Sequence, residues 1–579
     1  RGRLGRATWR DGTATDAEIA ALAAARAEGP VTLGPQPDTQ GFVGNGGFVA
    51  EAWVFLDESV PSSQRIFDKL TAGVNNGFLL DAYPDLGLRA IVGERVVQIP
   101  DALSVGVWQH IAAVVSPSGE VTLYRDGQRL AGGGDGYGTW VGDGDDAEVV
   151  SRAYRLQRFV RTCAGRGEFP IKFNGSIFTV PHAGAPGDAD YRRWGPGYWW
   201  QNTRLPYYAM LANGDEEQMA SLVRMYAVDM LPLLKYRTRA HLNQDGAYLN
   251  ECVYFWGDIF SESYGWTPAA EREDKLQASR WHKWEWVAAP ELSGLLLDYY
   301  DHTGNRDWLR EVALPAIYEF VLFFDQRYAL DETGHYFMHP AQALETWWDC
   351  DNPMPEVAGL HAITSRLLGL PAGLLTAEER AFYQQVAARV PPPPTHLVNG
   401  EPALAPAARF AQKSNIENPE LYAVWPFRLY SFDRPNPELA IRAYEARGDR
   451  GHGGWRHDSV FAAHLGLTDE ARDSLVIRAR SKAATERFPV FWGPNYDWTP
   501  DQCHGGVLEL TLQKMLLQTD GDRIWLLPAW PADWDADFRL HAPRRTVLEG
   551  QVRGGRLTTL TVTPNSRASD VLVVGASER

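Results

Sequence analysis

The stretch DWLREVALPAIYEFVLFFDQRYAL, residues 307–330, decides the fold of the longer part of the chain. Its apolar residues recur every three or four positions, which is the spacing of one face of an α-helix. Stretches with the same spacing follow one another from residue 153 to residue 519, and long loops rich in tryptophan and glycine separate them. Long ordered loops usually carry function. The pattern predicts a helical toroid over residues 146–520, with helices paired in two rings and loops converging on a central funnel.

The two ends of the chain have the alternation of β-strands instead. FVAEAWVFLDE (48–58), WQHIAAVVS (108–116) and EVTLYRDGQRLAGG (120–133) alternate apolar and polar residues between breaks rich in Gly, Pro, Asp and Ser. They predict an antiparallel β-sandwich within residues 1–145, a segment that also holds an alanine-rich helix near its start and a Gly/Asp-rich linker at its end. Residues 521–579 show strand alternation again and predict a small C-terminal β domain.

The composition excludes several classes of protein. The chain has 579 residues, of which 45% are hydrophobic and 22% charged, as in a soluble globular protein of two or three domains. Its net charge of −17 disfavours nucleic acid or an anionic membrane as partner. No apolar run approaches the roughly 18 residues of a membrane span, so none is predicted.

No cofactor or metal is predicted. The four cysteines, Cys163, Cys252, Cys350 and Cys503, lie far apart without metal spacing, although a Cys350–Cys503 disulfide is possible. No phosphate-binding or dinucleotide-binding glycine motif is present. The chain begins with Arg and shows no signal peptide, so the expected secreted or periplasmic location depends on a leader that was removed. The oligomeric state is left open.

Aromatic residues are unusually frequent and clustered. The chain holds 22 Trp, 23 Tyr and 23 Phe, and tryptophans recur in GYWWQN, RWHKWEW, ETWWD and FWGPNYDW. Aromatic faces suit the C–H faces of sugar rings, and the indole edge supplies a hydrogen-bond donor. The alternative is that these side chains fill a helical core. Because the clusters lie beside acids and amides in loop-like sequence, we favour a carbohydrate site.

Two resemblances follow from these motifs. The succession of EAWVFLDE, VGVWQHIAAVV and VTLYRDGQRLAGG resembles a laminin-G or concanavalin-like jelly roll, a module that binds glycans in some proteins and is a spacer in others. Residues 150–555 resemble glycoside hydrolase family 95, the inverting α-L-fucosidases and α-L-galactosidases with an (α/α)6 barrel, and a related group of barrel proteins. GDRIWLLPAWP (521–531) is similar to the end of that barrel's sequence.

The family resemblance implies catalytic roles for three residues. PAQALET (340–346) is similar to the segment that holds the family's general acid, which implies that role for Glu345. WQNTRLPYY (200–208) is similar to an asparagine-rich segment and implies that Asn202 holds the attacking water. PDQCHGG (500–506) precedes a helix as the family's supporting acid does, which implies that Asp501 polarises the same water.

The chemistry can also be stated from the residues. Glycoside hydrolysis needs an acid that protonates the leaving oxygen, and inversion needs a water held on the opposite face, with about 6.5–9.5 Å between the two groups. Trp347 and Trp348 would give Glu345 an apolar wall that raises its pKa and keeps it protonated. The alternative for Glu345 is a solvent-facing loop acid. Without the resemblance, Asp501 is more often a turn residue or a helix cap, and Asp497 is its rival.

Two departures from the family leave the substrate open. Trp200 replaces the first family asparagine, and IENPELYAVWPF (416–427) lacks the family's histidines. GAYLNECVYFWG (246–257) is similar to another family segment and implies a site role for Glu251. SRWHKWEW (279–286) is either a substrate-binding segment that includes Glu285 or the start of a barrel helix with Trp281 and Trp284 in the core. The predicted substrate-binding residues are Trp199, Trp200, Glu251, His282, Trp284, Trp347, Trp348, Trp492 and His504.

The leading functional hypothesis is an inverting glycoside hydrolase that removes a terminal or side-chain α-linked sugar, fucose-like or galactose-like, from a poly- or oligosaccharide. The first alternative is a polysaccharide lyase on the same barrel, which would need a Tyr or His base and cations for a uronate. The second is a glycan-binding protein without catalysis. In each case the partner is a carbohydrate.

Overall fold

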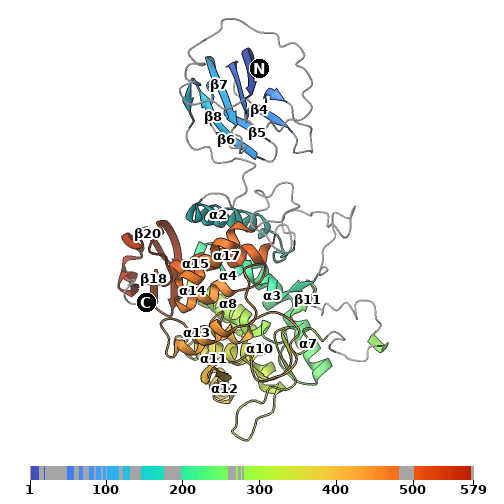
Figure 1. Ribbon diagram of the computed structural model, residues 1–579. Coiled ribbons are helices and arrows are strands. Elements are labelled where there is room, and N and C mark those ends of the chain that lie inside the picture. The colour runs from blue at the N-terminus through green and yellow to red at the C-terminus, as the bar shows by residue number, and fades with distance from the viewer. Residues whose placement is uncertain are drawn as a thin grey trace. The chain divides into compact units, whose positions relative to one another are not determined.

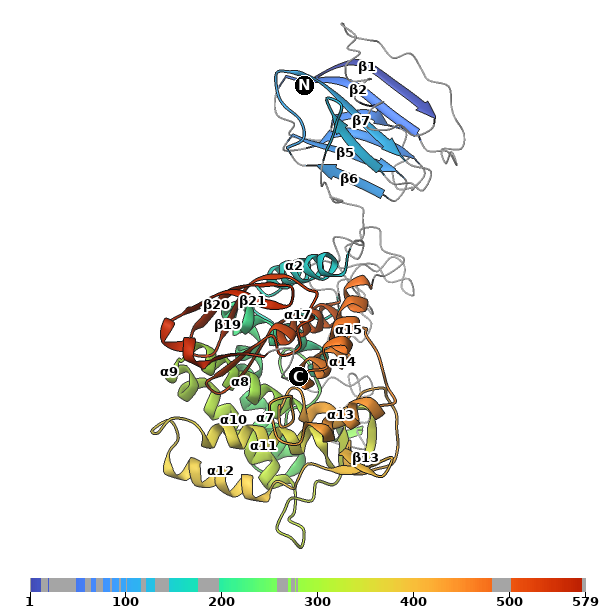
Figure 2. The ribbon, with the colours of Figure 1, turned by 60° about the vertical axis from the view of Figure 1, so that its left-hand side comes forward.

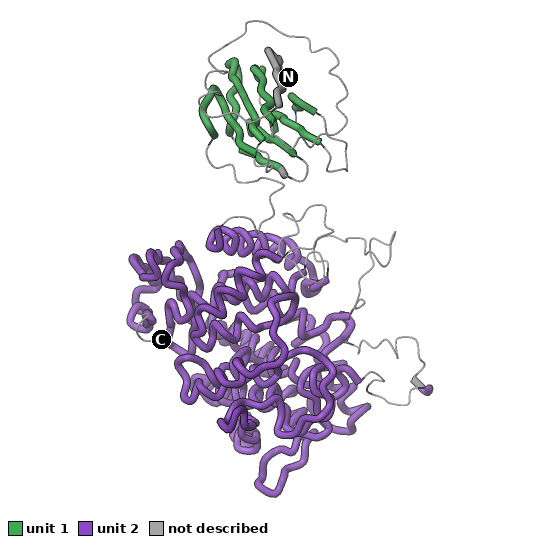
Figure 3. The backbone as a smooth tube through the Cα atoms, viewed as in Figure 1, with its two compact units in different colours: residues 1–143, 485–491 green, residues 144–484, 492–579 purple. Residues whose placement is uncertain are grey.

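The computed structural model describes residues 2–11, 19, 48–57, 64–68, 77–83, 86–92, 95–99, 101–115, 121–130, 145–174, 197–257, 269–271, 276, 280–481 and 501–574. The chain divides into two compact units (Figure 3). Arg1–Asp143 with Thr485–Phe491 form the first, and Gly144–Ala484 with Trp492–Arg579 form the second.

The first unit is a sandwich of two antiparallel sheets (Figure 2). One sheet has the order β1-β2-β7-β8-β9 and the other the order β3-β4-β5-β6. Alternate residues of β2 are buried, so one face of each sheet forms the core between them. The predicted β-sandwich is therefore confirmed. Its strands are β1 (Gly2–Asp11), β2 (Phe48–Leu56), β3 (Gln64–Asp68), β4 (Phe78–Tyr83), β5 (Gly87–Val92), β6 (Arg95–Ile99), β7 (Trp108–Val115), β8 (Val121–Arg125) and β9 (Gln128–Arg129).

The second unit is mainly helical, as predicted (Figure 1). The stretch 307–330 forms α9, a π-helical turn at Leu309–Ala313 and α10, whose buried face repeats at Ile317, Phe320 and Phe324. The helices are α2 (Asp146–Ala164), α3 (Trp200–Thr203), α4 (Leu205–Tyr208), α5 (Met210–Asn213), α6 (Ala220–Val223), α7 (Leu231–Leu242), α8 (Ala288–Thr303), α9 (Arg306–Trp308), α10 (Leu314–Arg327), α11 (Met354–Leu368), α12 (Ala377–Arg389), α13 (Pro437–Ala446), α14 (Asp458–Leu465), α15 (Thr468–Arg480) and α17 (Gln502–Leu516).

The helices of this unit pack in succession. Helix α8 contacts α10 and α11, α11 contacts α12, and α14 contacts both α15 and α17. The last helix, α17, also packs on the first, α2 (Figure 1). Contact between first and last helices is what a closed ring of helices requires, but the two-ring toroid itself stays a prediction.

Short strands cross the helical unit and position the site. Strands β12 (Ala341–Ala343), β13 (Trp347–Pro353) and β16 (Ala407–Phe410) form one small sheet, and β10 (Tyr198–Trp199) pairs with β11 (Cys252–Val253). A further hairpin consists of β14 (Thr395–Val398) and β15 (Glu401–Leu404).

The end of the chain is β-structure that packs on the helices. Its sheets are β17 (Leu517–Asp520), β18 (Arg523–Leu526) and β22 (Val571–Val573), and β19 (Ala536–Ala542), β20 (Thr546–Arg553) and β21 (Arg556–Thr563). Trp530, Leu540 and Leu548 share one core with Val460 of α14 and Leu508 of α17. The boundary at residue 521 stays a prediction. Within the described ranges, no helix combines the length and the hydropathy needed to cross a membrane.

Candidate active site

Four glutamates from four separate segments lie within electrostatic reach of one another in the helical unit. Glu251 directly precedes β11, Glu285 lies in the loop before α8, Glu345 lies between β12 and β13, and Glu417 precedes the 3-10 helix Pro419–Ala423. We call these four residues the acidic site. It includes two residues of the predicted site, Glu345 and Glu251, and Glu285, which comes from the segment 279–286 for which the sequence leaves a substrate-binding role open.

Glu345 is held at the tip of a tight connection between two paired strands. Leu344, just before it, has φ 56°, and Ala343 pairs with Trp347 across the turn. The Trp348 indole donates to the Glu345 carbonyl at 2.9 Å, and Asn415 Nδ2 donates to Glu345 Oε2 at 2.8 Å. The residue keeps partial contact with solvent. Burial, followed by the charge of Glu417, raises its pKa to about 8, which keeps it protonated near neutrality.

Glu417 connects Glu345 to the segment that carries Asn202. Its Oε1 accepts a hydrogen bond from Gln201 Nε2, and its Oε2 accepts one from Thr346 Oγ1 at 3.2 Å. The Glu417 backbone N–H donates back to Thr346 Oγ1 at 3.1 Å. Burial raises the Glu417 pKa to about 7, although these two side-chain hydrogen bonds favour the ionised form. The Glu417 carboxyl is therefore held by hydrogen bonds from both Gln201 and Thr346.

Glu251 and Glu285 are buried and incompletely hydrogen-bonded. Gln201 N–H donates to Glu251 Oε1 at 2.6 Å, but no described residue hydrogen-bonds to Oε2 of Glu251 or Glu285. Their exposed fractions are 1% and 2%. Burial and the neighbouring carboxyl groups raise the pKa of each well above its usual range. Buried acids with such shifted pKa values are typical of functional sites.

Asn202 and Asp501 each contact Cys503, the second residue of α17. Asn202 Nδ2 lies 3.1 Å from Cys503 Sγ, and no donor among the described residues reaches its Oδ1. Asp501 Oδ1 accepts the backbone N–H groups of Cys503 and His504, both at 3.0 Å, so this carboxylate caps the helix. Gln201 links Asn202 to the acidic site along the chain. The roles of Asn202 and Asp501 in holding water stay predictions, and Asp497 lies outside the described residues.

His504 and Trp200 are integrated into the core. His504 is fully buried, with Nδ1 accepting from Gly454 N–H at 3.2 Å and Nε2 donating to the Arg478 carbonyl at 2.8 Å. The Trp200 indole donates to Glu291 Oε2 at 2.9 Å, and its ring packs edge-on against Tyr226. These contacts favour structural roles, because neither ring presents a free face or polar atom.

Two pairs of aromatic rings connect the loop 280–286 with the segments of Asn202 and Glu345. Trp199 packs edge-on against His282 at 5.4 Å, and Trp281 against Trp348 at 4.8 Å. Burial lowers the His282 pKa to about 4, so this ring is neutral. Trp281 is 45% exposed in a loop, so the interpretation that placed it in the core of a barrel helix is wrong.

Two other predicted tryptophans lie against the protein. Trp347 packs on Phe410, and Trp284 lies partly buried against the core beside Trp286. Trp492 lies outside the described residues. The suggested disulfide is absent, because Cys350 Sγ donates to the Trp347 carbonyl and Cys503 lies against Asn202.

The sequence prediction omits three residues of the site: Gln201, Asn415 and Glu417. Gln201 is the neighbour of the predicted Asn202, and an amide within a predicted site segment is a usable signal. Glu417 lies in the stretch 416–427, where the sequence prediction weighs only the missing histidines. The glutamate in that stretch becomes significant only once the fold brings it to Glu345.

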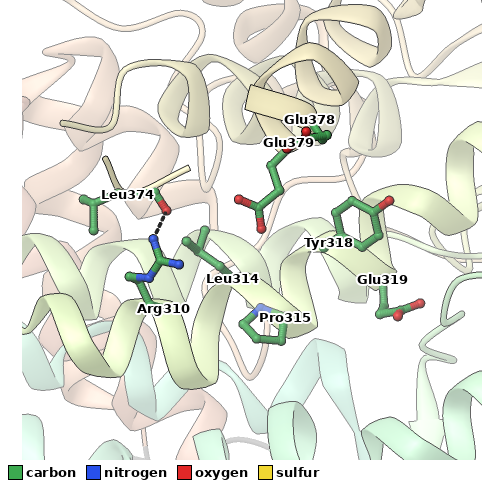
Figure 4. Close-up of a pocket in the computed structure, with 8 residues that line it drawn as sticks. All are labelled: Arg310, Leu314, Pro315, Tyr318, Glu319, Leu374, Glu378 and Glu379. Atoms are coloured by element: carbon green, nitrogen blue, oxygen red, sulfur yellow. Dashed lines mark hydrogen bonds between the residues drawn. The ribbon is translucent and has the colours of Figure 1, made fainter. Parts of the chain in front are cut away.

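Neither a metal centre nor the described surface pocket coincides with the acidic site. In the described ranges, no three His, Cys, Asp or Glu side chains are arranged to hold a metal ion. A pocket of about 420 Å³ lies between α10 and α12 (Figure 4). There Arg310 donates to the Gly373 and Leu374 carbonyls, Glu319 pairs with Lys235 and Glu379 caps α12. Its polar groups thus serve the fold, and we place the chemistry at the acidic site.

Comparison with known proteins supports the fold assignment. Residues 28–161 match the model of the concanavalin A-like lectin/glucanases superfamily. No curated protein matches the chain. Among solved structures, a putative kojibiose phosphorylase from human microbiome has a TM-score of 0.45 and 10% identity over 86% of this chain and 76% of its own. A variant of a glycosidase in complex with glucose has a TM-score of 0.42 and 14% identity over 64% of this chain and 99% of its own. At TM-scores below 0.5 these likenesses carry no argument about chemistry, whereas the family match confirms the concanavalin-like expectation for the β-sandwich.

Proposed function

We propose that the chain is a carbohydrate-active enzyme, an inverting glycoside hydrolase that removes a terminal or side-chain α-linked sugar of fucose or galactose type. The observation that carries the proposal is Glu345, a partly solvent-accessible residue whose pKa is raised to about 8 beside a second, fixed carboxyl. A group of this kind holds a proton at neutral pH and can donate it.

Glu345 acts as the general acid. It protonates the glycosidic oxygen while the bond to the anomeric carbon breaks, and the sugar ring develops positive charge. Glu417, whose pKa of about 7 leaves it partly ionised at neutral pH, stabilises that charge. Asn415 holds the Glu345 carboxyl in one orientation through its 2.8 Å hydrogen bond, which keeps the acid positioned toward the glycosidic oxygen.

Asn202 and Asp501 hold the attacking water on the opposite face of the sugar. The Asn202 amide oxygen, which no described donor occupies, accepts a hydrogen bond from the water. Asp501 completes the polarisation while its Oδ1 caps α17. As the water attacks the face opposite the leaving group, its proton passes to the Asp501 carboxylate and the bond to the leaving group breaks, which inverts the anomeric configuration.

The two alternatives fit the acidic site less well. A lyase needs a cation for the substrate carboxylate and a Tyr or His base, whereas the acidic site supplies carboxyl groups and the nearby Arg204 is already paired with Glu291. A protein that only binds glycan needs no group that donates a proton to a glycosidic oxygen. Neither alternative explains why Glu345 is both raised in pKa and reachable from solvent.

The decisive experiment is Glu345→Gln, assayed on a panel of aryl α-glycosides and natural polysaccharides with NMR of the released anomer. The variant should lose at least about 10³-fold in kcat while substrate binding, measured by calorimetry, changes little. Glu420→Gln is the matched control, since Glu420 also has its pKa raised to about 7 by burial but interacts with Asp449, Lys413 and Arg447 instead of Glu345. Wild-type protein that binds a glycan and never cleaves one would end the proposal.

A further inference from the structure

Around the acidic site, the amide and hydroxyl hydrogen-bond donors have partners within the protein, whereas some of the acceptor oxygens do not. Its donor nitrogens already serve the protein: Gln201 donates to Glu251 and Glu417, and Asn415 donates to Glu345. The Asn202 amide nitrogen faces Cys503, and the Thr346 hydroxyl donates to Glu417. The atoms of the acidic site that have no hydrogen-bond partner among the described residues are carboxyl oxygens.

Two of these oxygens belong to side chains that are almost completely buried. Oε2 of Glu285 makes no hydrogen bond with any described residue, and Oε2 of Glu251 makes none either. The Glu285 carboxyl interacts electrostatically with Glu251, Glu417 and Glu345, so it lies near the other three acids. A buried carboxyl oxygen without a hydrogen-bond partner is unfavourable, and a bound ligand that supplies donors offsets this cost.

Cations near the site do not fill this role. Arg204 lies with its Nε 2.9 Å from Glu291 and donates through Nη2 to the Tyr422 hydroxyl. Its Nη1 lacks a partner among the described residues, but Glu291 already matches its charge. Arg456 acts on Glu417 and donates to the Arg450 carbonyl. Neither arginine therefore supplies a hydrogen bond to the unpartnered oxygens of Glu285 and Glu251.

We propose that the acidic site recognises an amino sugar, with the protonated amine bound by the unpartnered carboxyl oxygens of Glu285 and Glu251. The inference rests on the proposed hydrolase function and names its substrate class. An ammonium group carries three N–H donors and no acceptor, which suits a set of vacant acceptors better than a hydroxyl does. A carboxylate sugar would need a cation, and the nearby Arg204 is already paired with Glu291. A metal ion is not favoured, because no described set of three ligands converges.

Binding of the amine is linked to proton release. Burial and mutual repulsion keep protons on the acids near neutrality, and an ammonium ion stabilises the ionised form, so a carboxyl group loses its proton to the buffer when the sugar binds. The titratable and charged groups that act on Glu285 and Glu251 are Glu345, Glu417, Glu356, Glu291 and Arg204. All of these except Arg204 are acids, and the ammonium relieves their repulsion of a newly ionised carboxylate.

Calorimetry on the full chain at pH 7 tests the inference with galactosamine against galactose and glucosamine against glucose. Each titration is repeated in phosphate and in Tris, whose ionisation enthalpies differ, to count released protons. At least one amino sugar should bind about tenfold or more tightly than its hydroxyl counterpart, with proton release. Glu285→Gln should remove both the preference and the release.

Glu420→Gln is the matched control, because burial also raises the pKa of Glu420 to about 7, but this acid interacts with Asp449, Lys413 and Arg447 and not with Glu285 or Glu251. Equal affinity for both members of each pair, binding without proton release, or no binding of either amino sugar at millimolar concentration overturns the inference. If Glu285→Gln does not fold, proton counting on the wild type decides alone. Cleavage of neutral glycosides without amino-sugar binding would refute this inference and leave the hydrolase proposal standing; the reverse result would refute the hydrolase proposal.

Discussion

The carboxyl group of Glu345 lies beside that of Glu417, whose charge makes ionisation of Glu345 more costly. Gln201 and Thr346 hold Glu417 by hydrogen bonds that favour its ionised form. Glu345 therefore keeps its proton through two effects, burial and a neighbouring charge. Only the second can be removed by a single isosteric substitution.

We expect Glu417→Gln to shift the pH dependence of activity. The general acid must be protonated, so kcat/KM of the wild type should fall as pH rises through the Glu345 pKa of about 8. Removing the Glu417 charge lowers that pKa, and the alkaline limb should move to lower pH. The measurement is a kcat/KM profile from pH 5 to about 9.5. An unchanged limb, or an equal shift in Glu420→Gln, would contradict the role of Glu417.

Sequence reasoning can select single residues only where a local pattern marks them. Glu345 is predictable because only Thr346 separates it from the tryptophan pair of ETWWD. Glu417 has no such pattern, and its significance arises from a contact across about seventy positions, through Thr346. The same limit applies to Trp200, which the cluster GYWWQN groups with Trp199 although the indole of Trp200 donates to buried Glu291.

At the level of elements, the N-cap of α17, Asp501, has two possible tasks. Asp501 accepts the N–H groups of Cys503 and His504, which is the work of an N-cap. Asp501 and Asn202 also both contact Cys503, and the proposed function gives Asp501 a second task at the attacking water. Stability and activity separate the two tasks, because asparagine caps a helix about as well as aspartate but carries no charge.

We expect Asp501→Ala to lower the free energy of unfolding by about 1 kcal/mol, and Asp501→Asn to leave it nearly unchanged. If Asp501 also polarises the attacking water, Asp501→Asn should still lose most of its kcat. Urea unfolding and steady-state rates measure the two quantities. Thr376→Ala, which removes the capping box of α12, serves as control and should lower stability without affecting kcat. Full activity in Asp501→Asn would leave this residue as a cap alone.

Helical elements are predictable where the apolar spacing is long and regular. The stretch 307–330 is predicted as helix and buries the expected face in α10. The loop 280–286 is harder, because aromatic residues at mixed spacing fit both a helix start and a binding loop. Its conformation depends on Gln342, whose side chain accepts from the Trp284 N–H and donates to the Trp281 carbonyl, a contact that local sequence does not encode.

For the whole molecule, the two units differ in what they bury. The first has an apolar core between two sheets. The second buries Glu251, Glu285 and Glu356, all with raised pKa values, beside its apolar clusters. Holding several acids out of water lowers the stability of the second unit in a way that depends on pH. We infer that this cost is accepted because the acidic site serves binding and catalysis.

Calorimetric unfolding should accordingly show two transitions, of which the one from the second unit shifts with pH. Glu356 has a folded pKa of about 8 against about 4.3 when unfolded, so between these values the folded state holds a proton that the unfolded state has released, and stability falls as pH rises. His282, whose pKa is lowered to about 4, makes stability rise with pH, but only below about pH 6.5. Lys514, whose pKa is lowered to about 8, has the same effect only above about pH 8. From about pH 6.5 to 8 the acids therefore dominate, each contributing at most about 1.4 kcal/mol per pH unit. Glu356→Gln, which keeps an acceptor for the Trp286 N–H, should make this slope shallower, and a midpoint that does not change over this range would show that the buried acids are already ionised in the folded protein.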